Sequence, residues 1–252
     1  MALPLLADTS SAQVVTIAKN LRWLAPIAKS AKCLPVRKIE WLAEESARAG
    51  GTKKVGAWLA ARKLPNSVLE DTYLRISIQN GHLPREEAET MFSRLNGKPG
   101  FRTTLRKISG SNAAKSGGHM NELRLASAAE ESQMTVVEIG APFDDPAKKG
   151  LTDIDLLLKY KSKTIAIEAK DYLPTTPYPM DKFRADMETL KAFQNANPNQ
   201  KILPVFSVTS RPADPEQWAL LKTAAKINDI HLIVGDPQQQ AAQLMLLAVS
   251  VP

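Results

Sequence analysis

The sequence has 252 residues and only one cysteine, Cys33. A single cysteine excludes an internal disulfide and a zinc site built from several cysteines, and it is typical of a reducing compartment. No stretch approaches the roughly 18 consecutive apolar residues that a membrane helix needs. The apolar start lacks a basic leader and soon reaches Asp8, so it does not resemble a signal peptide. We therefore expect no membrane partner and a cytoplasmic location, or export without a cleavable signal peptide.

Several familiar enzyme signatures are also missing. The sequence contains no Walker-type loop, no glycine-rich dinucleotide fingerprint, no His-Glu-x-x-His and no nucleophile elbow. Hydrophobic residues make up 44% and charged residues 23%, which is typical of a folded globular protein. Evidence for function must therefore come from the distribution of the charged residues.

Positive charge is concentrated in the first part of the chain. Residues 1–110 contain 18 Lys and Arg against 9 Asp and Glu, whereas residues 111–252 contain 15 against 17, so +9 and −2 add up to the net charge of +7. Basic surfaces attract nucleic acid, because Lys and Arg that neutralise phosphates release counterions. This distribution favours a polyanionic partner, although a surplus that only confers solubility would look the same.

Turn residues and apolar spacing divide the chain into two predicted domains. Residues 1–110 show apolar residues every three or four positions and no strand-like run, which predicts an all-α, basic N-terminal domain. Within it we expect helices at Val68–Gln79 and between Pro84 and Asn96. A glycine-containing loop, Gly110–Gly118, leads into an α/β domain at residues 111–252.

The second domain is expected to contain a mixed central sheet flanked by helices. The expected elements are the helix Met120–Ser132, the strands Thr135–Ile139, Asp153–Leu158 and Thr164–Lys170, the helix Asp181–Ala196, the strand Ile202–Val208, the helix Asp214–Asn228, the strand His231–Val234 and the helix Pro237–Val249.

Two of these strands form a predicted β-hairpin with a turn centred on Lys161-Ser162. With this turn Tyr160 pairs with Lys163, Leu158 faces Ile165 and Leu156 faces Ile167. The same register sets Asp155 opposite Glu168 and Asp153 opposite Lys170 on the other side of the sheet. A slip of one residue would scatter these charges to opposite faces, so the prediction depends on the register.

The charged face of this hairpin is a candidate metal site. Two carboxylates on adjacent strands repel each other, so a cation is expected between Asp155 and Glu168. Hard divalent ions such as Mg²⁺ or Mn²⁺ bind carboxylate oxygens. Lys170, two residues after Glu168, would orient an attacking water or offset charge that grows on a phosphate. The alternative is an exposed hairpin whose charges only face water.

Asp155, a gap of 12 residues and then Glu168-Ala169-Lys170 are similar to the Asp…Glu-x-Lys signature of the PD-(D/E)xK, or restriction-endonuclease-like, nuclease superfamily. The expected helix-strand-strand-strand-helix-strand order from about residue 111 onward also resembles the core of that superfamily. Ile154 stands where the name-giving motif has proline. The resemblance implies a nuclease that hydrolyses phosphodiester bonds with Mg²⁺ or Mn²⁺ and favours DNA over RNA.

The resemblance also implies a role for Glu122, which lies on the helix before the first core strand and would complete the metal site. Asp153 is a rival ligand for the metal, or an ion-pair partner of Lys170. Weaker candidates for contact with nucleic acid are Lys115, His119, Lys182 and Arg184. The first two flank Gly117-Gly118, a turn that can present backbone N–H groups to a phosphate. A flexible loop and a solvated helix face explain these four residues equally well.

A helical leader before a C-terminal nuclease is also similar to antibacterial toxins that bacteria deliver into competitors. That resemblance implies a cognate inhibitor, or immunity, protein and export into a target cell. Nucleases of DNA repair and phage defence have similar cores and remain an alternative. A protein that binds nucleic acid without cleaving it, and a purely structural interaction protein, are further alternatives.

Overall fold

The computed structural model describes residues 66–79, 81–109, 113–146 and 150–250. The part of the predicted all-α domain that precedes residue 66 lies outside this range, as do the 11 Lys and Arg and 4 Asp and Glu of residues 1–65. The described elements are α5 (Asn66–Gln79), α6 (Arg85–Leu95), α7 (Phe101–Ser109), α8 (Ala113–Glu131), β1 (Thr135–Phe143), β2 (Thr152–Tyr160), β3 (Lys163–Lys170), α9 (Met180–Ala196), β4 (Lys201–Val208), α10 (Pro215–Ile227), β5 (His231–Val234) and α11 (Pro237–Ser250).

The strands form one mixed sheet of five strands in the order β1-β2-β3-β4-β5. Strands β1, β2 and β3 are antiparallel neighbours, whereas β4 runs parallel to β3 and β5 runs parallel to β4. This confirms the predicted α/β class with a mixed central sheet flanked by helices. The parallel pairs need crossovers, and helices α9 and α10 provide them.

Local sequence signals explain where the helices over this sheet begin. Helix α10 starts at Pro215, and the side chain of Asp214 accepts a hydrogen bond from the backbone N–H of Glu216. Helix α11 starts at Pro237, and Asp236 accepts a hydrogen bond from the backbone N–H of Gln239 at 2.9 Å. In both cases an aspartate caps the helix and proline occupies the first turn, where its missing N–H costs nothing.

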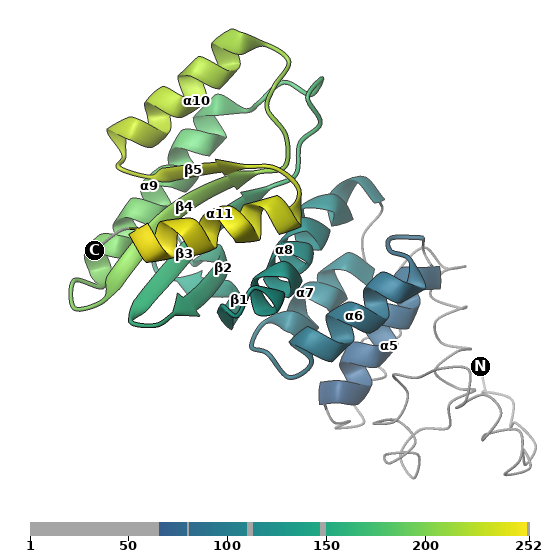
Figure 1. Ribbon diagram of the computed structural model, residues 1–252. Coiled ribbons are helices and arrows are strands. Elements are labelled where there is room, and N and C mark those ends of the chain that lie inside the picture. Colours follow the sequence, from purple (N-terminus) through teal and green to yellow (C-terminus); the bar gives the residue numbers. More distant parts are fainter. Residues whose placement is uncertain (1–65, 80, 110–112, 147–149, 251–252) are drawn as a thin grey trace, which may run out of the picture.

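Helices cover both faces of the sheet (Figure 1). Side chains of α8 and α11 share one hydrophobic cluster with β1, β2 and β3, and it includes Leu123, Leu156 and Leu244. Side chains of α9 and α10 form a second cluster with the sheet, which includes Phe183, Phe206 and Leu221. The two clusters make a three-layer arrangement that fixes the ends of the strands between helices.

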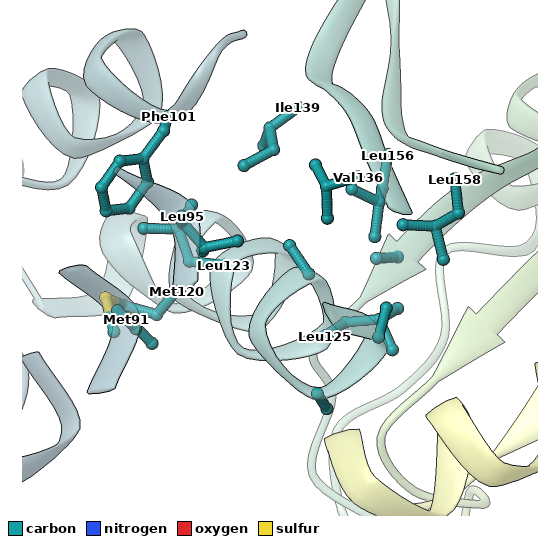
Figure 2. Packing of buried hydrophobic residues seen from close by; sticks show 14 of the residues in the cluster. Met91, Leu95, Phe101, Met120, Leu123, Leu125, Val136, Ile139, Leu156 and Leu158 are labelled. Atoms are coloured by element: carbon teal, nitrogen blue, oxygen red, sulfur yellow. The ribbon is translucent and has the colours of Figure 1, made fainter. Parts of the chain in front are cut away.

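Helix α8 is the central helix of the molecule. It lies between the sheet and the helices α5, α6 and α7, so that both of its sides are covered (Figure 1). Figure 2 shows Leu95 and Phe101 on one side of Leu123, and Ile139 and Leu156 on the other. Helices α5–α7 thus share a hydrophobic core with the sheet, whereas the domain boundary at residue 110 stays a prediction.

Two expectations for this region differ from the structure. The prediction of a loop over Gly110–Gly118 is wrong for the residues after 112, because α8 begins at Ala113 and runs through Gly117-Gly118. A Cβ atom at Gly117 would meet Asp171 Oδ2 at 3.3 Å, so glycine here allows close packing rather than breaking the helix. Helix α7 has no counterpart among the predicted elements, although its buried residues at Phe101, Leu105 and Ile108 have helical spacing.

Candidate active site

The β2–β3 hairpin has the predicted register from the turn to Leu156, whereas the described ladder does not extend to the predicted pairs of Asp155 with Glu168 and Asp153 with Lys170. Tyr160 pairs with Lys163, and the ladder continues to Leu156 paired with Ile167. Asp155 follows directly after the last pair of this ladder, and its Oδ2 accepts a hydrogen bond from the backbone N–H of Ala169 at 2.8 Å. The aspartate therefore takes the place of a backbone acceptor and is fixed at the open end of the hairpin, next to Glu168 and Lys170.

The ammonium of Lys170 is the centre of a cluster of acidic side chains. Lys170 Nζ lies 2.7 Å from Glu168 Oε2 and 3.3 Å from Asp155 Oδ2. A third carboxylate, Asp186 of α9, places its Oδ2 3.0 Å from the same nitrogen. The structure thus brings together the predicted residues Asp155, Glu168 and Lys170 and adds Asp186.

These charges are largely removed from water. The side chain of Glu168 is 5% exposed and that of Lys170 is 12% exposed. Burial and the neighbouring Asp155 raise the pKa of Glu168 well above its ordinary value, although Lys170 works in the opposite direction. Burial alone would lower the pKa of Lys170, but the surrounding carboxylates outweigh it and raise this pKa. Lys170 is therefore held as an ammonium ion.

Glu122 reaches the same region from α8. Its side chain is 8% exposed, and its Oε1 lies 2.9 Å from His119 Nδ1. The pKa of Glu122 is raised to about 7. Burial is the largest cause, the hydrogen bond with His119 works in the opposite direction, and the negative charge of Asp155 adds to the increase. The same hydrogen bond raises the pKa of His119. Glu122 and His119 therefore form a proton-sharing pair that feels the charge of Asp155.

Asp153 is separated from this cluster. Its side chain is 48% exposed, and its Oδ2 lies 3.5 Å from Lys107 Nζ of α7. The ion-pair partners of Lys170 in the structure are Asp155, Glu168 and Asp186, so the alternative in which Asp153 pairs with Lys170 is not formed. An exposed aspartate that pairs with an exposed lysine is the weaker of the two candidate metal ligands, because its charge is already screened by solvent.

Sequence reasoning missed Asp186. This residue lies three positions after Phe183 and four before Leu190, and both of these side chains are buried on α9. A charge at this spacing falls on or beside the apolar stripe of the helix, where it must find a partner. That spacing was the available signal, but only the packing of α9 on β3 identifies Lys170 as the partner.

The four weaker candidates for nucleic-acid contact lie in different surroundings in the structure. Lys115 lies in α8, and its side chain is outside the described residues. His119 lies beside Glu122, whereas Lys182 is exposed on α9 and Arg184 donates to Asp181 Oδ1 at 2.9 Å on the exposed surface. The phosphate-binding turn expected at Gly117-Gly118 is wrong, because a continuous helix uses its backbone N–H groups internally.

The donor chemistry of the cluster fits a hard divalent cation. Its oxygen donors are carboxylates, two of them with a raised pKa. Asp186 Oδ2 is buried and, among the described residues, has an ion pair with Lys170 but no hydrogen-bond partner. Within the described ranges, no three His, Cys, Asp or Glu side chains are arranged as a group that could hold a metal ion. The present spacing of the carboxylates is set around the Lys170 ammonium, which occupies the centre of the cluster.

No family model and no curated protein matches the chain. Among the described residues, no helix combines the length and the apolar character needed to cross a membrane.

Proposed function

We propose that this protein is a divalent-metal-dependent nuclease that hydrolyses phosphodiester bonds, with DNA as the favoured substrate. One observation carries the proposal: Asp155 and Glu168 converge on Lys170 at the open end of the β2–β3 hairpin, at 3.3 Å and 2.7 Å. A structural ion pair needs one carboxylate for each ammonium. Here the carboxylates of Asp155, Glu168 and Asp186 surround one ammonium, and a bound divalent cation would offset the negative charge that exceeds it.

The element order supports the proposed membership in the PD-(D/E)xK superfamily. Helix α8 precedes the antiparallel strands β1, β2 and β3, and α9 then leads to β4, which is parallel to β3. Asp155 and Glu168 lie on β2 and β3, and Glu122 comes from α8, which are the positions that the resemblance implies.

Each residue has a distinct part in the proposed reaction. Asp155, Glu168 and Glu122 would hold Mg²⁺ or Mn²⁺, whose Lewis acidity offsets the negative charge of the phosphate when it is bound. Lys170 would place its ammonium beside the phosphate and stabilise charge that develops on its oxygens. His119 keeps a proton next to Glu122 and so adjusts the charge of that carboxylate.

The proposal is tested by incubating plasmid DNA and total RNA with the purified protein, in the presence of Mg²⁺, Mn²⁺ or a chelator. We expect cleavage of DNA that requires the metal and that falls about a thousandfold in Glu168→Gln and Lys170→Met, near the upper range for loss of one electrostatic group in a site. Glu188→Gln, which changes an exposed carboxylate of α9, is the matched control.

The outcomes distinguish the proposed activity from its rivals. Equal cleavage by Glu168→Gln and the wild type would refute the proposed site. Salt-sensitive binding of DNA without cleavage under any condition would instead support a non-enzymatic nucleic-acid-binding protein.

A further inference from the structure

We propose that Asp186 is a positioning residue, which holds the ammonium of Lys170 in the site when a cation engages Asp155 and Glu168. The inference rests on the proposed function and adds a residue that the Asp…Glu-x-Lys pattern does not contain. Asp186 belongs to α9, whereas the other two carboxylates belong to the hairpin. Its Oδ2 lies 3.0 Å from Lys170 Nζ. Asp186 therefore contacts the reactive group of the site from a separate element.

The environment of Asp186 Oδ2 indicates that Lys170 is its main source of stabilisation. This oxygen is buried and has no hydrogen-bond partner among the described residues, although the ammonium lies at ion-pair distance. The contact thus has the distance of a salt bridge without the geometry of a hydrogen bond. A buried carboxylate oxygen without a donor is costly unless a cation stands next to it. The stabilisation of Asp186 Oδ2 therefore depends on the position of the Lys170 ammonium.

The charges around Lys170 indicate what its contact with Asp186 does when a cation is bound. Three carboxylates, those of Asp155, Glu168 and Asp186, surround the one ammonium of Lys170. A divalent cation bound at this cluster would offset the negative charge that the ammonium leaves unbalanced. Such a cation takes oxygen ligands, so it would displace the ammonium from Asp155 and Glu168 and also repel it. Asp186 is the carboxylate that remains to keep Lys170 in place.

The inference predicts how the site fails without this carboxylate. If Asp186 becomes neutral, Lys170 has only Asp155 and Glu168 as partners, and it then competes directly with the cation for both. Cation affinity should fall, and the ammonium should be misplaced in the loaded enzyme. Substrate binding through other surfaces should change little, so the loss should appear in kcat rather than in KM.

The first test compares Asp186→Asn, Asp186→Glu and the control Glu188→Gln. Glu188 lies two positions away on the same helix and is exposed, so its substitution makes the same charge change outside the site. We expect Asp186→Asn to lower kcat about a hundredfold with KM within about twofold. Asp186→Glu should recover most of the loss, and Glu188→Gln should resemble the wild type. If Asp186→Asn and Asp186→Glu lost the same share of kcat/KM, and if this loss came from a higher KM with kcat unchanged, the inference would be wrong.

The second test is a double-mutant cycle with Lys170→Met, read by Mn²⁺ affinity from calorimetric titration. If Asp186 acts through Lys170, Asp186→Asn should weaken Mn²⁺ binding about tenfold in the wild type and at most about threefold in Lys170→Met. Equal losses in both backgrounds would show that Asp186 contributes only a general negative field, and the inference would be wrong.

The same four proteins are unfolded with urea in the presence of chelator. A coupling of about tenfold or more in the unfolding equilibrium constant is expected from a buried ion pair, whereas additive effects would contradict the Asp186–Lys170 contact. The unfolding measurement also distinguishes failure of the proposed nuclease function from failure of the proposed role of Asp186. If the wild type neither binds Mn²⁺ nor cleaves DNA, the proposed function fails, and the unfolding cycle alone decides whether Asp186 holds Lys170.

Discussion

The two ends of the β2–β3 hairpin both contain charged residues, but the surroundings of these residues differ. At the turn end, Lys159 and Lys161 are exposed, and Lys163 donates to the backbone carbonyl of Ala248 at 2.8 Å. At the open end, Glu168 and Lys170 are 5% and 12% exposed. Exposed charges are screened by water and salt, whereas the buried ones interact strongly with each other.

The difference arises from the helices that cover the open end. Helix α8 brings Glu122, and α9 brings Asp186, and both helices pack their apolar side chains on the sheet. The same packing that forms the core therefore removes water from one end of the hairpin only. Charged residues alone do not make a site; their burial together, with too few cations to neutralise them, is what distinguishes the open end.

The largest expected effect separates Asp155 from Asp153, two aspartates on the same strand. Asp155→Asn should lose cleavage about as completely as Glu168→Gln, because it removes the negative charge of a partly buried carboxylate that contacts Lys170 and Ala169. Asp153→Asn should keep cleavage within about threefold, because its ion pair with Lys107 is exposed. Initial rates of plasmid nicking measure both. Loss of cleavage in Asp153→Asn alone would move the metal site toward α7.

The next effect concerns pH in the metal-free protein. Burial raises the pKa of Glu122 from 4.5 to about 7, so the folded state binds this proton more tightly than the unfolded state. The corresponding stability is fully present below pH 4.5 and is lost as the pH rises through about 7, a change of about 3 kcal/mol at 1.36 kcal/mol per pH unit. The raised pKa of His119 acts in the same direction.

Urea unfolding in chelator at several pH values checks this expectation. Glu122→Gln should flatten the dependence between pH 4.5 and about 7, because the amide mimics the protonated acid without titrating. A turn-end variant, Lys161→Met, should keep the slope of the wild type. Parallel curves for Glu122→Gln and the wild type would mean that Glu122 does not carry the pH dependence.

The smallest effect belongs to the turn end. Lys163→Met removes the hydrogen bond to the carbonyl of Ala248 near the end of α11, a position where a positive charge favours the helix. We expect a loss of about 1 kcal/mol of unfolding free energy and unchanged cleavage. Denaturation midpoints and nicking rates of the same preparation give both quantities. A fivefold drop in cleavage would show that the turn end also takes part in substrate contact.

The sequence by itself determined the elements of the sheet and the hairpin register. Strand β5 has the predicted bounds His231–Val234, and Tyr160 pairs with Lys163 as expected. These features follow from local rules, because the alternation of apolar residues and a two-residue turn leave one register that buries the apolar face. The placement of Asp155 and Glu168 next to Lys170 is a direct consequence of that register.

Only the tertiary structure decided which charges meet across elements. Asp186 of α9 pairs with Lys170, Asp153 pairs with Lys107 of α7, and Gly117 of α8 lies close to Asp171. No local period contains this information. It depends on how helices that are distant in the chain pack on the sheet. That packing is fixed by the summed burial of many apolar side chains and cannot be read from any single charged residue.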